Sequence, residues 1–125
     1  MARILLVDDD DTFRRMLRLA LLRMGHIVEE AHDGGQAWAK FQAQQPDLVI
    51  MDLIMPEKEG LETIQLFRKN RCTAKILAVS GGGRVDARDM LTIAKQLGAD
   101  AVLPKPFSNE ELTEVLKKLL PLATS

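Results

Sequence analysis

The sequence predicts an α/β fold in which a parallel sheet carries helices on both faces, a doubly wound arrangement. Five short apolar runs alternate with five longer amphipathic stretches, so a strand–helix unit repeats along the whole chain. Each apolar run is too short for a buried helix and is followed by polar or turn residues, as expected of a strand. Most runs are continuous rather than alternating, which is typical of strands covered on both faces.

The predicted strands lie at residues 4–7, 27–28, 48–51, 76–79 and 101–103. The second run continues into Glu29 and Glu30, which makes it the most polar of the five. A polar strand is poorly suited to the middle of a sheet that is covered on both faces. We therefore expect this strand at an edge.

Apolar residues at three- and four-residue spacing predict a helix after each strand. The first begins near Phe13; we expect Asp11 to cap it, with Asp10 and Thr12 as alternatives. The other helices are marked by apolar positions within residues 37–41, 61–67, 90–97 and 112–119. Ser108 and Glu111 have the spacing of a capping box, which sets the start of the last helix.

Length and composition indicate one domain, and we expect residues 1–125 to form it. There are 17 Lys and Arg residues against 18 Asp and Glu residues, a net charge of −1, so neither nucleic acid nor an anionic membrane is an expected partner. No apolar run approaches the roughly 20 residues of a membrane span, and the first residues do not resemble a signal peptide. Cys72 is the single cysteine and is expected to be structural. We predict a cytoplasmic protein.

Residues with complementary chemistry stand where the predicted strands end. Asp8 and Asp9 follow the first strand, Asp52 the third, Ser80 the fourth, and Lys105 lies just beyond the fifth. The carboxyl ends of parallel strands share one edge of the sheet, so these side chains should converge. Clustered carboxylates repel unless a cation neutralises them, and Mg²⁺ prefers oxygen ligands. A carboxylate, a metal and donors for phosphoryl oxygens are what phosphoryl transfer requires.

Each of these residues also has a plain structural explanation. A run of Asp after a strand is most often a helix cap in a solvated turn. Ser80 alone could be a turn residue beside Gly81, and Lys105 alone is usually a surface cation. Their coincidence at four strand ends is what favours a common site.

Four segments of the sequence contain these positions: Val7-Asp8-Asp9; Met51-Asp52-Leu53-Ile54-Met55-Pro56 with Gly60; Val79-Ser80-Gly81; and Lys105-Pro106-Phe107. Together they resemble the receiver domain of bacterial two-component response regulators, and the resemblance covers essentially the whole chain. Within that family, the chain is similar to stand-alone, chemotaxis-type receivers. The resemblance implies a flavodoxin-like (βα)5 fold with strand order 2-1-3-4-5.

The resemblance also implies a metal site. Asp9 would bind Mg²⁺ directly, together with Asp52 and the backbone carbonyl of Ile54. Asp8 would orient a metal-bound water. Mg²⁺ is therefore the one cofactor that we expect.

For the phosphoryl group, the resemblance implies that Asp52 is the acceptor. Ser80 would hydrogen-bond the phosphoryl group after transfer, and Lys105 would pair with it. The Lys105–Pro106 peptide bond would be cis, which an X-Pro bond adopts at a cost of only about 1 kcal/mol.

The implied function is signalling. The domain would take a phosphoryl group from a histidine kinase or a phosphotransfer protein and change the surface that it presents to a downstream protein, whose identity the sequence does not indicate. We expect no output domain, a monomer or weak dimer, and no enzymatic activity beyond its own phosphorylation and dephosphorylation.

Two alternatives stay open. Many receivers carry an aromatic residue where this chain has Val102, so a pseudo-receiver that binds a partner without phosphate is one alternative. The other is a haloacid-dehalogenase-like phosphatase, because Asp8-x-Asp10-x-Thr12 matches its opening motif, with Asp8 as nucleophile and Asp10 as acid/base. That alternative leaves the motif around Asp52 unexplained.

Overall fold

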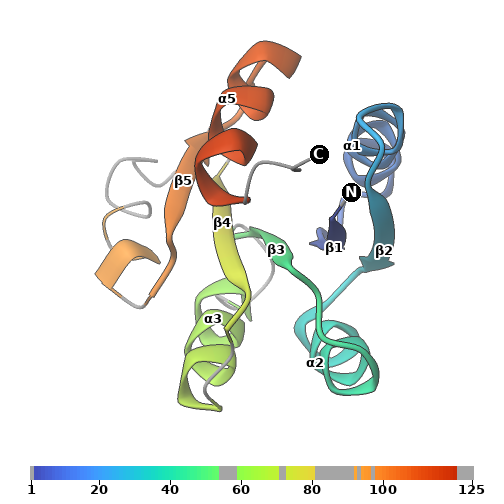
Figure 1. Ribbon diagram of the computed structural model, residues 1–125. Helices are drawn as coiled ribbons and strands as arrows, with labels where there is room; N and C mark the ends of the chain where they lie inside the picture. The colour runs from blue at the N-terminus through green and yellow to red at the C-terminus, as the bar shows by residue number, and fades with distance from the viewer. Residues whose placement is uncertain are drawn as a thin grey trace.

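Five parallel strands form a single sheet in the order β2-β1-β3-β4-β5, as Figure 1 shows. The strands are β1 (Arg3–Val7), β2 (Ile27–Ala31), β3 (Leu48–Asp52), β4 (Lys75–Ser80) and β5 (Ala101–Pro104). The computed structural model describes residues 2–53, 59–70, 73–80, 92, 94–96 and 98–120, without the side chains of 59–61. Both the parallel sheet and the expected strand order are confirmed.

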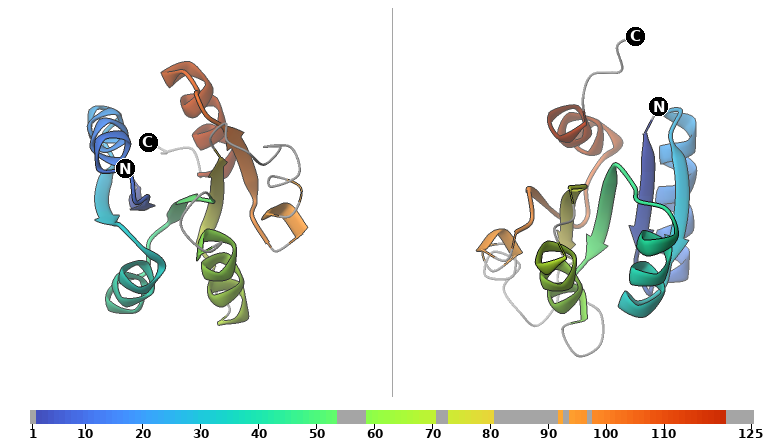
Figure 2. Two further views of the ribbon diagram at one scale, coloured as in Figure 1. Left: turned by 180° about the vertical axis from the view of Figure 1, so that it is seen from behind. Right: turned by 60° about the horizontal axis from the view of Figure 1, so that its bottom comes forward.

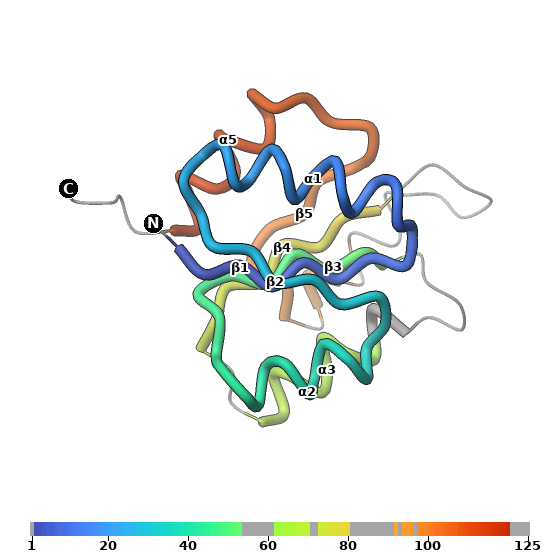
Figure 3. Tube along the Cα trace, turned by 90° about the vertical axis from the view of Figure 1, so that its right-hand side faces the viewer, coloured from blue at the N-terminus to red at the C-terminus, as the bar shows by residue number. Residues whose placement is uncertain are grey.

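The helices cover both faces of this sheet. They are α1 (Asp11–Arg23), α2 (Gly34–Ala43), α3 (Glu59–Lys69) and α5 (Asn109–Leu119). Of the predicted fourth helix, residues 92 and 94–96 are described, and they are helical. Figure 3 shows α1 and α5 on one side of the sheet and α2 and α3 on the other, and Figure 2 shows the same pairing from behind. None of the described helices is both long and apolar enough to cross a membrane.

Two apolar clusters, one on each face, hold the layers together. Because successive strand residues point to opposite faces, Leu5 and Val7 of β1 join one cluster and Ile4 and Leu6 the other. The first cluster also takes residues of α2 and α3, and the second takes residues of α1 and α5. β1, β3 and β4 are thus buried on both faces, which explains their continuous apolar runs.

The edge position of β2 is confirmed as well. Ile27 is 39% exposed, and the following three residues of the strand are only half-buried. Trp38 of α2 packs on the first cluster through stacked and tilted contacts with Phe41 and Phe67, as expected of a core residue. Cys72 lies outside the described residues.

One helix cap differs from our prediction. Asp10, rather than Asp11, caps α1: its backbone is extended and its carboxylate accepts a hydrogen bond of 3.1 Å from the amide of Phe13. Asp11 is instead the first helical residue. The sequence cannot separate adjacent acids in one turn, because each can place an oxygen near the free amides. The predicted capping box of α5, formed by Ser108 and Glu111, is confirmed.

Candidate functional site

The strand ends bring the predicted residues together at one edge of the sheet. Asp8 is the residue after β1, Asp52 is the last residue of β3, and Ser80 is the last of β4. Lys105 follows β5 directly, and its amide donates to the carbonyl of Ser80. The Lys105–Pro106 bond is cis, as expected. Because the strands are parallel and in register, four residues that are far apart in the sequence lie together at one site.

Three carboxylates form the acidic part of the site. Asp8, Asp9 and Asp52 each offer an oxygen, and these atoms all lie within 4.8 Å of one another. Asp8 is 2% exposed and Asp52 4%, whereas Asp9 is exposed. Buried carboxylates at this spacing repel one another, and a hard divalent cation with oxygen ligands would relieve that repulsion. The donor set therefore fits Mg²⁺.

Lys105 supplies the positive charge of the site. Its Nζ lies 3.0 Å from Oδ2 of Asp8 and 3.8 Å from Oδ1 of Asp52. The same ammonium stands 3.8 Å from the centre of the Phe13 ring, which packs edge-on against Phe107 at 5.9 Å. A cation over a ring face is attracted by it, so the two rings form a wall that holds Lys105 toward the carboxylates.

The sequence did not indicate this aromatic wall. Phe13 belongs to the apolar stripe of α1, and that pattern predicts core packing alone. Phe107 was part of the Lys-Pro-Phe motif, which was the only available signal for its role.

Ser80 contributes a hydroxyl that is fully buried. Its Oγ has no hydrogen-bond partner among the residues that the structure describes. An unpaired buried hydroxyl costs about 1–3 kcal/mol, so such groups call for an explanation. A ligand that accepts a hydrogen bond at the end of β4 would provide one.

Asp8 is anchored by Asp10, the N-cap of α1, and by Arg14 within α1. The amide of Asp10 donates to its Oδ1 at 2.9 Å, and Nη1 of Arg14 donates to its backbone carbonyl at 2.7 Å. Burial alone would lower the pKa of Arg14, but hydrogen bonds to Asp11 and Glu30 outweigh it and raise that pKa. The hydrogen bond from Arg14 in turn lowers the pKa of Asp11. Arg14 was not predicted, because it interrupts an apolar stripe without a recognisable motif.

Four further positions or segments complete the comparison with the sequence, two outside the described residues and two within them. The backbone carbonyl of Ile54 and the residues 81–83 fall outside the described residues. Val102, at the position where many receivers carry an aromatic ring, is partly buried against the cluster that contains Trp38. Asp10, the acid/base of the phosphatase alternative, uses its carboxylate to cap α1.

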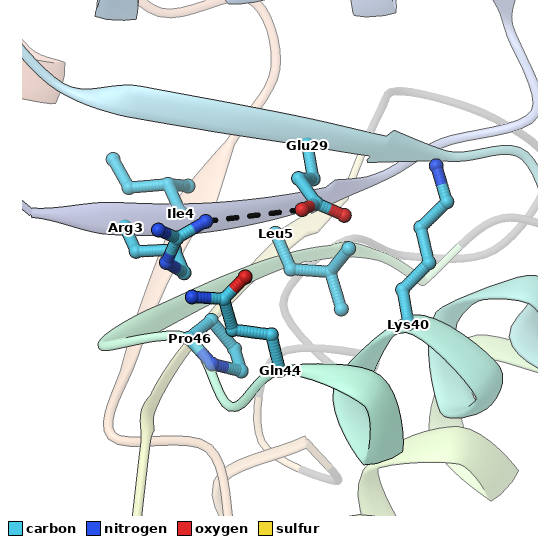
Figure 4. A pocket seen from close by; sticks show the side chains of 7 residues that line it. All are labelled: Arg3, Ile4, Leu5, Glu29, Lys40, Gln44 and Pro46. Atoms are coloured by element: carbon cyan, nitrogen blue, oxygen red, sulfur yellow. Dashed lines mark ion pairs between the residues drawn. The ribbon is translucent and has the colours of Figure 1, made fainter.

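A recess lies away from these residues, between α2 and the strands β1 and β2 (Figure 4). It is open to solvent and is lined by Arg3, Ile4, Leu5, Glu29, Lys40, Gln44 and Pro46. Arg3 pairs with Glu29 across it at 3.8 Å, and Lys40 donates to the carbonyl of Glu30. None of the acidic-site residues lines this recess, so it is not the candidate site.

Comparisons with known proteins agree with the geometry. A family model described as the response regulator receiver domain matches residues 4–117. The response regulator MprA of Mycobacterium tuberculosis is 38% identical over 118 residues, which make up 94% of this chain and 50% of MprA. The chain thus spans about half the length of the curated relatives that it matches.

Solved structures give the same picture. The chemotaxis protein CheY4 of Vibrio cholerae has 33% sequence identity and a TM-score of 0.84, and the match covers 96% of this chain and 99% of CheY4. NtrX from Brucella abortus has 27% identity and a TM-score of 0.87, with 95% of this chain and 26% of NtrX covered.

Proposed function

The chain belongs to the response regulator receiver domain family, and on this basis we propose that Asp52 accepts a phosphoryl group in a reaction that requires Mg²⁺. One observation supports this above all: three carboxylates lie within 4.8 Å of one another, beside the ammonium of Lys105 and at the same sheet edge as the Ser80 hydroxyl, which has no hydrogen-bond partner among the described residues. Receiver domains are signalling domains, and they generally bind Mg²⁺ in such an acidic pocket.

The proposed reaction uses Asp52 as the nucleophile. An oxygen of its carboxylate attacks the phosphorus of the donor, the bond from phosphorus to the leaving group breaks, and the leaving group departs with the electron pair. The product is an acyl phosphate on Asp52. Asp52 is the last residue of β3 and pairs with Val79 of β4, so its backbone is held by the sheet, which favours attack from one direction.

The other residues stabilise charge. Mg²⁺, held by Asp9 and Asp52 with the carbonyl of Ile54, would neutralise carboxylate and phosphoryl oxygens. Asp8 would orient a water of the metal. Lys105 lies near both buried carboxylates, so a small movement would let it pair with a phosphoryl oxygen. Ser80 would donate its hydroxyl to another phosphoryl oxygen, which would satisfy a group that has no partner in the described part of the chain.

Receiver domains interact with histidine kinases and with downstream targets. We propose that residues 1–125 act as one such domain, with a histidine kinase or a phosphotransfer protein as the phosphoryl donor. The signal would then pass to a protein partner through a changed surface. The activities of whole relatives such as MprA are not carried over, because the match covers only half of their length.

The test is labelling with acetyl phosphate, followed by intact-protein mass spectrometry. We expect one added phosphoryl group in the presence of Mg²⁺ and none with EDTA. Asp52→Asn should remain unmodified, whereas Asp47→Asn should be modified like the wild type. Asp47 is an exposed carboxylate before β3, at the opposite end of that strand, and is therefore a matched control. A folded wild-type protein that stays unmodified would favour the pseudo-receiver.

A further inference from the structure

Arg14 of α1 is a buried cation that the proposed chemistry does not use. Its side chain is 11% exposed, and a charged group at such depth is costly unless its donors are paired. Nη1 donates to the carbonyl of Asp8 at 2.7 Å, Nε to Oε1 of Glu30 at 3.0 Å, and Nη2 lies 2.7 Å from Oδ1 of Asp11. Each of the three nitrogens of the planar guanidinium thus has an oxygen partner.

The contact with Asp8 has consequences for its neighbour. The carbonyl that Arg14 holds belongs to the peptide group that joins Asp8 to Asp9. Because a peptide group is planar, fixing its oxygen restricts rotation on both sides, and with it the direction in which Asp9 leaves the backbone. The amide and the carboxylate of Asp8 are anchored separately, by the carbonyl of Ala31 and by Lys105.

Asp9 needs such backbone support more than the other two carboxylates. It is exposed, and within the described part of the chain no hydrogen bond or ion pair holds its side chain. Asp8 and Asp52, by contrast, are buried and lie next to Lys105. The position of the Asp9 carboxylate therefore depends on its backbone.

Arg14 is itself anchored from outside the site. Glu30 of β2 binds it and also pairs with Arg18 at 3.4 Å, while the carbonyl of Glu30 accepts a hydrogen bond from Lys40 of α2. Lysine could not replace this arrangement, because the three donors of an ammonium sit on one nitrogen and cannot reach three acceptors that lie around a planar guanidinium.

We propose that Arg14 is a positioning residue that holds the Asp8–Asp9 peptide group, so that the Asp9 carboxylate stays within reach of those of Asp8 and Asp52. This inference rests on the proposed function, since it concerns the carboxylates assigned there to Mg²⁺. It predicts an effect on metal affinity that the stability of the fold alone would not produce.

The test measures Mg²⁺ binding by isothermal titration calorimetry at a temperature where every variant is folded by circular dichroism. Arg14→Met should raise the Kd for Mg²⁺ roughly tenfold, the lower end of the loss seen when support behind a metal ligand is removed. Arg14→Lys keeps the charge but should still bind Mg²⁺ more weakly than the wild type. At saturating Mg²⁺, acetyl phosphate should label both variants at nearly the wild-type rate, because the reacting groups are unchanged.

Two controls separate positioning from stability. Arg18 lies on the same helix and pairs with the same Glu30, but it does not contact Asp8. Arg18→Met therefore removes a contact with Glu30 alone. Leu21→Ala removes a fully buried side chain of α1 and destabilises the fold without altering the acidic site. Both should keep the wild-type Kd for Mg²⁺.

The outcomes are distinct. A wild-type Kd in Arg14→Lys, or equal weakening in Leu21→Ala, would overturn the inference and leave the proposed function intact. If Arg14→Met does not fold, Arg14→Lys decides alone, since it retains the buried stem and the charge. A wild-type protein that binds no Mg²⁺ would overturn the proposed function, and this inference with it.

Discussion

Asp52 should be a source of instability when no metal is bound. Asp8 and Asp52 are both buried, and one ammonium cannot neutralise two carboxylates with Asp9 close by. We expect Asp52→Asn to raise the free energy of unfolding in EDTA by about 1 kcal/mol, a modest fraction of the Coulomb repulsion at this separation. Urea denaturation of the wild type, Asp52→Asn and Asp47→Asn measures this effect. A clear loss of stability in Asp52→Asn would show that its ion pair with Lys105 outweighs the repulsion.

Ser80 offers a complementary prediction. Because its Oγ has no partner in the described residues, Ser80→Ala breaks no hydrogen bond there. The free energy of unfolding should stay equal or rise, by up to about 1 kcal/mol, since a buried hydroxyl is desolvated without compensation. The same variant should hold the phosphoryl group less well, so its steady-state labelling by acetyl phosphate should fall. If the variant is markedly less stable in denaturant titration, the hydroxyl has a partner in the fold.

The sequence predicted Asp8, Asp52, Ser80 and Lys105 because each stands at or just beyond a strand end, and parallel strands bring such ends together. It did not predict the contact between Lys105 and Phe13, because the direction of a helical side chain depends on packing and not on spacing alone. Arg14 was not predicted either, because no recognisable motif contains it.

Whole elements follow from the sequence more securely than their ends do. The apolar spacing of α1 and the continuous runs of β1, β3 and β4 predicted these elements to within a few residues. The predicted cap of α1 was wrong by one position, because Asp10 and Asp11 have the same side chain and only their backbone conformations distinguish them. The edge position of β2 could be predicted, since the charges of Glu29 and Glu30 exclude it from the centre.

The stability that the junction between α1 and β2 contributes to the fold should depend on pH. His26 precedes β2, and its Nδ1 accepts a hydrogen bond of 3.2 Å from the amide of Ala2. Burial lowers the pKa of His26 below its ordinary value of about 6.5, so the unfolded chain binds a proton more readily than the native protein. The stability that neutral His26 contributes is present above that value and is lost as the pH falls toward the native pKa.

Denaturant titrations between neutral and acidic pH check this sign. His26→Asn keeps an acceptor at a similar place but does not titrate. The stability difference between the wild type and this variant should shift against the wild type as the pH falls. A difference that does not change with pH would mean that His26 contributes nothing to the pH dependence.

At the scale of the whole molecule, the repeated strand–helix unit predicted the doubly wound sheet, because each run has to be covered on both faces. The strand order did not follow from that pattern; it came with the family resemblance and is confirmed by the pairing of β1 with both β2 and β3. Since that order places β1 beside β3, it also brings Asp8 and Asp9 next to Asp52.

Mg²⁺ should therefore stabilise the entire fold by mass action. A ligand that binds only the native state adds about 2.7 kcal/mol at a concentration of 100 times its Kd. The Tm of the wild type should rise with Mg²⁺ concentration, and that of Asp9→Asn should rise much less. Na⁺ at equal ionic strength is the control. Equal shifts in the two proteins would place the metal elsewhere.

If Asp52 carries the phosphoryl group, a chemical trap should locate the group on that residue. The protein would be treated with acetyl phosphate and Mg²⁺, trapped by reduction of the acyl phosphate with borohydride, digested, and analysed by tandem mass spectrometry. We expect a single modified residue, Asp52, and no modification in Asp52→Asn. Modification of Asp8, as expected of a phosphatase that uses Asp8 as its nucleophile, would show that Asp52 is not the acceptor.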